Sequence, residues 1–235
     1  MNIIKKALAT LILASNVAYA EPQISWTTAE LPGKNSLRGS AIHGNSLWVT
    51  GSKNGVFRST DQGKTWVDVS VKAKIITDFR DIELFDENTA IVMGVGSGEE
   101  SMLYKTVDGG KSWQLLLANT DKTGFFDSID FWDNKRGLLL GDPVDGYYVV
   151  NKTVDGGKSW KRIGKNKLPT MQKNESAFAA SGNTLIVGQK GKAYITTGGF
   201  AASVYISMDW GETWRREAVP LHNKTQTSGG YGLAL

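Results

Sequence analysis

The sequence contains no cysteine, and it has only five prolines and two histidines among 235 residues. The absence of cysteine excludes a disulfide scaffold, a thiolate zinc site and a thiol nucleophile. His43 and His222 have no serine or carboxylate at a spacing that indicates a catalytic triad. We therefore expect no metal site and no cofactor. Apolar residues at 40% and charged residues at 21% are typical of a globular protein and not of a disordered chain.

Long hydrophobic runs are also scarce, and the one near the N-terminus is typical of an export signal. Lys5 and Lys6 precede an apolar run at 7–14, and Ala18-Tyr19-Ala20 matches a small-residue cleavage site. The run is shorter than the ~20 residues of a membrane-spanning helix, and these flanks do not favour the alternative of a buried N-terminal helix. The sequence predicts a signal peptide over 1–20, cleavage after Ala20, a mature domain over 21–235, and a periplasmic or secreted location. A lipoprotein anchor is excluded because no cysteine follows the cleavage site.

Strong charge of one sign is missing too. The chain has a net charge of +4, which falls to +2 when Lys5 and Lys6 leave with the signal peptide. Nucleic-acid binding requires lysine and arginine clustered on one face. The weak and dispersed charge therefore gives no case for a nucleic-acid partner.

Glycine is abundant, with 27 residues, and six of them belong to an internal repeat. One phrase, [S/T]-x-D-x-G-x-[T/S]-W, occurs four times, at 59–66, 106–113, 153–160 and 207–214. Successive aspartates are 47, 47 and 54 residues apart. A period of that size, with several strands in each unit, is typical of propeller blades. The repeat therefore predicts an all-β propeller.

The residue types in the repeated phrase are those of a tight turn between two outer strands. Aspartate accepts hydrogen bonds from backbone N–H groups of its own turn, glycine adopts a positive φ, and tryptophan fills the space between neighbouring blades. The phrase matches the Asp-box, or BNR, repeat known from sialidases and from many propellers without enzymatic activity. We interpret it as structural, in preference to catalysis or calcium binding. The structural positions are Asp61, Gly63, Trp66, Asp108, Gly110, Trp113, Asp155, Gly157, Trp160, Asp209, Gly211 and Trp214.

Alternation of apolar and polar residues divides each repeat into four short strands. The predicted strands are 37–42, 46–50, 55–59 and 65–69; 79–85, 90–94, 102–106 and 112–116; 126–132, 137–141, 147–153 and 159–163; and 176–180, 184–188, 202–207 and 213–218. They form four complete blades.

Two further segments resemble parts of additional blades. Residues 25–32 resemble the strand that follows a box, and residues 228–235 resemble the first strand of a fifth unit. Propellers commonly close by combining strands from the two termini in one blade. We therefore expect a C-terminally truncated chain that lacks about two blades, in preference to a complete ring of four or five.

Four charged residues occupy one register in the predicted innermost strands. Arg38, Arg80, Asp127 and Glu175 lie 13 or 14 residues before the glycine that ends the second predicted strand of each blade. An unpaired buried charge is costly, so we expect these side chains to face a hydrated channel mouth. Two interpretations stay open: salt bridges that hold the blades in register, or a polar pocket for a ligand or peptide. The segment 141–146 (GDPVDG) is first a turn and second a candidate acidic loop.

The phrases between the boxes carry a family resemblance. They are SLRG (36–39), WVTGSKNGVFRSTDQGKTW (48–66), DFRD (78–81), FFDSIDFWD (125–133), GDPVDG (141–146) and ESAFAASG (175–182). Together they resemble bacterial relatives of the photosystem II stability/assembly factor. This resemblance implies a seven-bladed ring in the complete protein and the binding of a membrane-protein assembly intermediate through an arginine-rich patch. Arg38 and Arg80 are the corresponding positions here, accompanied by the acidic Asp127 and Glu175.

The sequence thus favours an exported binding protein that assists the assembly or stability of a membrane or envelope protein. The alternative is a sialidase-like glycoside hydrolase acting on carbohydrate, with Asp127 and Glu175 as a weak candidate carboxylate pair. Arginines that such a site needs for a sugar carboxylate are present at 38, 58, 80, 136, 162, 215 and 216. The Arg-Ile-Pro phrase that normally supplies the first of them is absent.

Overall fold

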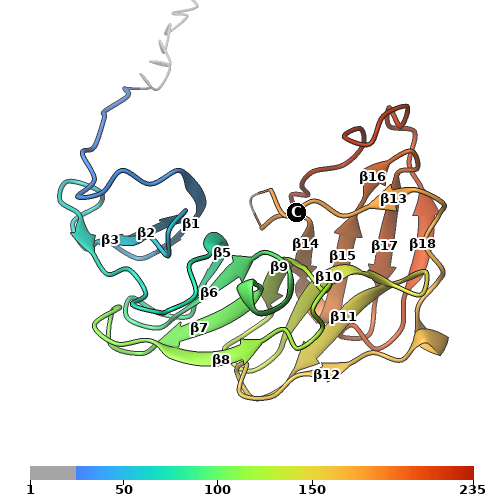
Figure 1. The fold of residues 1–235 in the computed structure, drawn as a ribbon, viewed down its shortest axis with the longest axis horizontal. Helices are drawn as coiled ribbons and strands as arrows, with labels where there is room; N and C mark the ends of the chain where they lie inside the picture. Colours follow the sequence, from blue (N-terminus) through green and yellow to red (C-terminus); the bar gives the residue numbers. More distant parts are fainter. Residues whose placement is uncertain (1–24, 181) are drawn as a thin grey trace, which may run out of the picture.

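The computed structural model describes residues 25–180 and 182–235, so the predicted signal peptide and its cleavage site lie outside the described residues. Four four-stranded antiparallel sheets follow one another along the chain (Figure 1). The first three sheets are β1 (Leu37–His43), β2 (Ser46–Gly51), β3 (Val56–Ser59) and β4 (Val67–Asp68); β5 (Asp78–Leu84), β6 (Ala90–Val95), β7 (Met102–Thr106) and β8 (Gln114–Ala118); and β9 (Phe126–Phe131), β10 (Gly137–Val144), β11 (Tyr147–Thr153) and β12 (Lys161–Arg162). The fourth is β14 (Leu185–Gly188), β15 (Lys192–Thr196), β17 (Ser203–Ser207) and β18 (Arg215–Ala218). This is the predicted all-β propeller architecture, with one sheet per blade.

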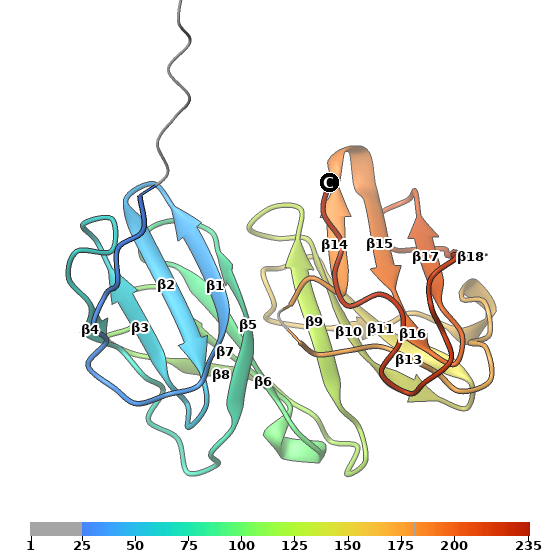
Figure 2. The ribbon, with the colours of Figure 1, turned by 90° about the horizontal axis from the view of Figure 1, so that it is seen from above.

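The first strand of each sheet lies at its inner edge. Strand β5 contacts both β1 and β9, and β9 contacts β14, so the four inner strands follow one another around a common centre (Figures 1 and 2). A fifth, two-stranded sheet pairs β13 (Glu175–Ser176) with β16 (Gly198–Gly199). In the part of the chain that the structure describes, no helix is both long and apolar enough to cross a membrane.

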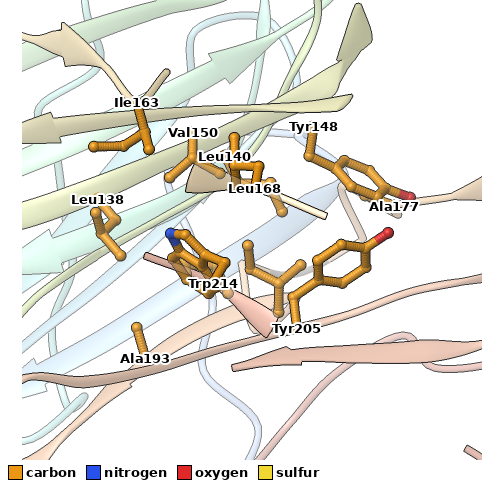
Figure 3. Close-up of a cluster of buried hydrophobic side chains, with 12 residues drawn as sticks. Leu138, Leu140, Tyr148, Val150, Ile163, Leu168, Ala177, Ala193, Tyr205 and Trp214 are labelled. Carbon is orange, nitrogen blue, oxygen red and sulfur yellow. The ribbon is translucent and has the colours of Figure 1, made fainter. Parts of the chain in front are cut away.

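Each pair of neighbouring blades encloses its own apolar cluster. Trp48 and Phe79 lie in the cluster between the first two blades. Figure 3 shows the cluster between the third and fourth blades, where Tyr148, Tyr205 and Trp214 contribute the aromatic rings. Burial of these side chains contributes about 25 cal/mol for each Å² of apolar surface removed from water. The blades are therefore held together by the faces of their sheets, which the strand alternation makes apolar.

The four repeated phrases fold into four identical turns. Each aspartate accepts a hydrogen bond from the hydroxyl two residues before it, and from both the N–H and the hydroxyl four residues after it. The glycine has a φ of 76–85° in every copy, a conformation that a side chain would oppose. The indole N–H of Trp66, Trp160 and Trp214 is donated to the carbonyl of that glycine, whereas Trp113 donates to Val69 of the preceding blade. The carboxylate thus closes the turn.

Replacing one of these aspartates tests how much the turn contributes to stability. Asp155 accepts hydrogen bonds of 2.9 Å from Ser159 N, 2.6 Å from Ser159 Oγ and 2.9 Å from Thr153 Oγ1. The Ser159 hydroxyl and amide lower its pKa to about 2. We expect Asp155→Ala to lower the free energy of unfolding by about 1–2 kcal/mol, as loss of a capping side chain does. Urea unfolding at pH 7 measures this change. Asp155→Asn, which keeps one acceptor oxygen, should cost less; equal losses would contradict the interpretation.

The predicted strands of the fourth blade need correction. The sequence pattern predicts residues 184–188 as the second strand, but Leu185–Gly188 is the inner strand β14. The second strand is Lys192–Thr196, which the sequence analysis missed, and the predicted inner strand 176–180 is wrong beyond Ser176. The physical reason is that Ala177–Ala180 pairs with no neighbouring strand. The tyrosine and isoleucine of Lys192–Thr196 instead alternate between the two faces of the sheet.

The two fragments predicted to belong to further blades are not strands either. Residues 25–36 form no strand, and Trp26 is 93% exposed. Within 228–235 the only strand-like pairing is an isolated bridge between Gly229 and Gly198. The C-terminal segment runs back over the fourth blade, where it approaches the centre of the molecule (Figure 1).

Candidate ligand pocket at the channel mouth

Three of the four charged residues predicted to share a register lie at matching irregularities of the inner strands. Pairing shifts by one residue around Arg38 in β1, around Arg80 in β5 and around Asp127 in β9. A β-bulge redirects the side chain at that position. Each bulge lies near the start of its strand, so the three side chains come from the same end of the inner strands. We call this end of the inner strands the channel mouth.

Glu175 does not belong to this set. It lies on β13, where it pairs with Gly199, because the glycine used to count its register ends the first strand of its blade and not the second. Its side chain is 2% exposed. It accepts hydrogen bonds from Tyr205 Oη at 3.0 Å, from Gln172 N at 2.6 Å and from the hydroxyl of Thr197. Glu175 therefore accepts the hydrogen bonds of a buried network, and its carboxylate is not accessible to a ligand in this structure.

Arg38 and Arg80 lie side by side through a shared carboxylate. Asp78 Oδ2 accepts Arg38 Nε at 3.3 Å and Arg80 Nε at 3.1 Å. Arg80 Nη1 also donates to the carbonyl of Ala179 at 2.9 Å, which links the second blade to the segment before β14. The Arg38 side chain is 42% exposed and that of Arg80 is 31% exposed. The guanidinium of Arg80 is thus fixed in place but still accessible at the rim of the mouth.

A pocket of about 340 Å³ opens beside Arg80. Its other lining residues are Phe125, Asp127, Asp142, the segment Ala177–Ala180 and Tyr231. Asp127 is 2% exposed, and its Oδ2 has no hydrogen-bond partner among the described residues. Burial, reinforced by the nearby charge of Asp142, raises the pKa of Asp127 well above its usual range. Burial also raises the pKa of Asp142. The pocket therefore contains two neighbouring carboxyl groups that protonate more readily than exposed ones.

Aromatic rings form the apolar wall of this pocket. Phe178 and Tyr231 stack with their centroids 4.3 Å apart and their planes within 13°. The Tyr231 hydroxyl donates to Thr227 O at 2.5 Å, which fixes the ring although the residue is 41% exposed. An exposed, oriented aromatic pair next to charged groups is a common element of binding sites.

Behind the pocket lies a buried pair of tyrosines. Tyr148 and Tyr205 meet edge to face at 5.3 Å, and in Figure 3 their hydroxyls point to the same side of the cluster, where Ala177 lies. The Tyr148 hydroxyl has no hydrogen-bond partner in the described part of the chain. Burial, followed by the charge of Glu175, raises the pKa of both phenols, so both stay protonated. Charges on Asp127 and Asp142 raise the pKa of Tyr148 further, which places that phenol close to the carboxyl pair.

A second cavity, of about 330 Å³, is lined by all four inner strands. Its carboxyl groups come from Asp81 and Glu83 on β5 and from Asp130 on β9. Burial raises the pKa of Asp81 to about 7 and that of Asp130 to about 6, and burial with the charge of Asp130 raises the pKa of Glu83. Asp81 accepts Ile129 N at 2.8 Å and Asp130 accepts Val187 N at 2.6 Å, so these carboxyls connect neighbouring blades. Residues 25–180 and 182–235 contain no set of three histidine or acidic side chains arranged for one metal ion.

Sequence reasoning missed several residues of the mouth pocket. Asp142 was named only as part of a turn, but it belongs to the long strand β10, whose turn is formed by Asp145 and Gly146 at positive φ. That Asp-Gly pair is a type I′ hairpin signal, and it would have left Asp142 on the strand. Phe178 and Tyr231 reach the pocket from segments without regular strands, and no local pattern indicates their positions.

The fold defines the chain as a β-propeller. A family model described as the DUF6242 beta propeller domain matches residues 8–232, and the chain belongs to this family. No curated protein matches the sequence.

Solved structures of other propellers are similar at low identity. The GH74 enzyme from Niastella koreensis is 20% identical with a TM-score of 0.54, over 80% of this chain and 25% of that one. The GH74 xyloglucanase from Xanthomonas campestris is 17% identical with a TM-score of 0.53, over 78% and 29%. YCF48 bound to a D1 peptide is 15% identical with a TM-score of 0.48, over 87% and 75%. This chain thus spans less than a third of either GH74 enzyme, and the likeness to them shows the fold.

Proposed function

We propose that this chain is an exported binding protein that holds a segment of a membrane or envelope protein at its channel mouth and assists that partner's assembly or stability. The observation that carries the proposal is the fixed but accessible guanidinium of Arg80 beside a pocket with an aromatic wall. Arginine has five N–H donors. In Arg80, the Nε donor binds the Asp78 carboxylate and one Nη1 donor binds the Ala179 carbonyl. The remaining donors are available to a carboxylate or a backbone carbonyl of the partner.

The apolar wall complements this donor. Arginine and aromatic residues are enriched at the centres of protein interfaces, where a desolvated contact contributes most of the affinity. Arg80, Phe125 and the stacked pair Phe178 and Tyr231 supply both kinds of group within one pocket. A peptide segment with one acceptor and one apolar side chain fits this combination. Arg38 binds the same Asp78 carboxylate as Arg80 does, so it adds a second positive charge to the rim of the pocket.

A glycoside hydrolase is the second candidate, because Asp127 and Asp142 form a neighbouring carboxyl pair with raised pKa values, and a general acid needs such a value. Two observations weigh against the sialidase type of chemistry. Tyr205 and Glu175, which would supply its nucleophile and base, are 1% and 2% exposed. The raised pKa of Tyr205, caused by burial and then by Glu175, also keeps its phenol protonated.

The test removes the guanidinium and measures capture of the partner. Tagged full-length protein is incubated with extract of its native envelope, and the captured protein is identified and titrated. We expect Arg80→Ala to weaken its binding at least tenfold, equivalent to about 1.4 kcal/mol, because the pocket loses its fixed donor. Arg215→Ala on the outer strand β18 serves as the control and should bind as the native protein does. Urea unfolding should show that Arg80→Ala changes stability by about 1 kcal/mol or less, as for other exposed ion pairs.

Two results would contradict the proposal. One is undiminished capture by Arg80→Ala. The other is hydrolysis of fluorogenic glycosides that Asp127→Asn abolishes, which would favour the hydrolase instead.

A further inference from the structure

We infer that the floor of the mouth pocket, formed by Asp127 and Asp142, is a recognition site for one basic side chain, lysine or arginine, of the partner protein. This inference rests on the proposed function and names the chemistry of the group that enters the pocket. It is carried by a cavity, by a buried carboxyl oxygen without a partner, and by an aromatic wall.

The first observation is a buried oxygen atom of Asp127. Nearly all buried polar atoms in proteins have a hydrogen-bond partner, and each exception calls for an explanation. Asp127 Oδ2 is such an exception in the described structure, in a residue that is 2% exposed and lines the cavity. The hydroxyl of Tyr148, whose pKa is raised in part by the charge of Asp127, is another buried polar atom without a partner among the described residues. A donor that enters through the cavity would supply the missing partner for the carboxyl oxygen.

The charges around the pocket decide which kind of donor fits. The charge of Asp142 on β10 acts on Asp127, and the charges of both carboxyls act on the phenol of Tyr148 on β11. Glu175 and Tyr205 lie next to Tyr148. Asp142 also lines a separate pocket that includes Arg162 of β12. Arg80 on β5 is the lining cation, and it is already bound to Asp78 and to the Ala179 carbonyl. Neither carboxyl forms a salt bridge among the described residues. A positively charged ligand can therefore pair with them as they ionise, whereas a neutral ligand would leave any negative charge there uncompensated.

The walls fit the rest of a basic side chain. The pocket of about 340 Å³ is bounded by Phe125, Phe178, Tyr231 and the alanines of Ala177–Ala180. Lysine and arginine carry apolar stems that pack on such surfaces while the charged end reaches a polar group. A cation near the face of Tyr231 or Phe178 is also attracted to the aromatic ring. The partner's backbone would then lie at the rim, within reach of Arg80.

Binding should be linked to protons, because the carboxyls ionise when the cation arrives. Burial raises the pKa of Asp127 and of Asp142, so in the empty pocket these carboxyls keep their protons to a higher pH than exposed ones, and a bound cation favours proton loss. Affinity for a basic side chain should therefore rise with pH as these carboxyls ionise. Affinity for a neutral side chain should stay constant over the same pH range.

The experiment uses the full chain and three peptides that differ at one position. The peptides are Ac-Ala-Ala-X-Ala-Ala-NH₂ with lysine, norleucine or glutamate at X, titrated calorimetrically at pH 5, 6.5 and 8 in two buffers of different ionisation enthalpy. We expect the lysine peptide to bind at least tenfold more tightly than the other two at pH 8, with release of protons. Asp127→Asn should weaken the lysine peptide about 30-fold, which corresponds to about 2 kcal/mol. Asp145→Asn, in the turn next to Asp142 and outside the pocket, is the charge-matched control and should bind as the native protein does.

Several outcomes would overturn the inference. They are equal binding of the norleucine peptide, unchanged affinity in Asp127→Asn, or a preference for the glutamate peptide. If Asp127→Asn does not fold, as judged by near-ultraviolet circular dichroism, Asp142→Asn provides the same comparison at a half-buried position. If the native chain shows no preference for the lysine peptide while Arg80-dependent capture persists, this inference alone is refuted. Absence of any Arg80-dependent partner would refute the proposed function instead.

Discussion

Replacing Trp48 by alanine is expected to lower the free energy of unfolding by about 3–5 kcal/mol, the cost of emptying a large aromatic site in a core. Trp48 is fully buried between the first two blades. Its ring meets Trp113 edge to face at 6.3 Å, and the Arg58 guanidinium lies 5.2 Å from its centroid. Its indole N–H donates to Ser46 Oγ at 2.9 Å. The substitution therefore removes apolar contact and a hydrogen bond at the same time.

Trp26→Ala provides the matched control, because that tryptophan is 93% exposed. It should change stability by less than about 0.5 kcal/mol, as surface substitutions usually do. Urea unfolding followed by circular dichroism at pH 7 measures both variants. A loss in Trp48→Ala no larger than that in Trp26→Ala would show that the interface between the first two blades contributes little to stability.

The second large effect is a dependence of stability on pH that arises from Asp81. The pKa of this buried carboxyl is about 7 in the folded chain, against an ordinary value of 3.8. The folded state therefore holds the proton more firmly than the unfolded state does. The corresponding stability is fully present below pH 3.8 and is lost as the pH rises through about 7. One pKa unit corresponds to about 1.4 kcal/mol, so the loss between pH 5 and pH 8 is on the order of 3 kcal/mol.

Asp81→Asn should remove this dependence. The groups around Asp81 are Glu83 on its own strand, Asp130 and Ser128 on β9, and the carbonyl of Gly182, so each ionisation in the cavity increases repulsion. Relative to the native protein, the variant should gain stability between pH 5 and pH 8 by about the same 3 kcal/mol.

Asp145→Asn is the control for this pH series. The hydrogen bond from Lys165 lowers the pKa of Asp145, so it titrates below this window and should give parallel curves. Urea unfolding of the three proteins at pH 5, 6.5 and 8 makes the comparison. A variant curve parallel to that of the native protein would show that Asp81 is ionised throughout the range.

The boundary between what could and could not be predicted is clearest in the fourth blade. The first three blades follow one spacing, and their strands match the predicted ranges within a few residues, except that β4 and β12 are only two residues long. In the fourth, seven additional residues precede the box aspartate, and the glycine used to count the register ends a different strand. Glu175 was therefore placed at the mouth, although its side chain lies in a buried network with Tyr205.

The sequence by itself determined the four turns and the blade architecture. The reason is that the hydrogen bonds accepted by each box aspartate join residues no more than four positions apart, so a short phrase contains all of their donors and acceptors. The tertiary structure alone decided the pocket. Arg80 reaches the Ala179 carbonyl across 99 positions, and Tyr231 stacks on Phe178 from a different segment. The raised pKa values also depend on burial by distant strands, and burial is a property of the packed blades that no local sequence pattern contains.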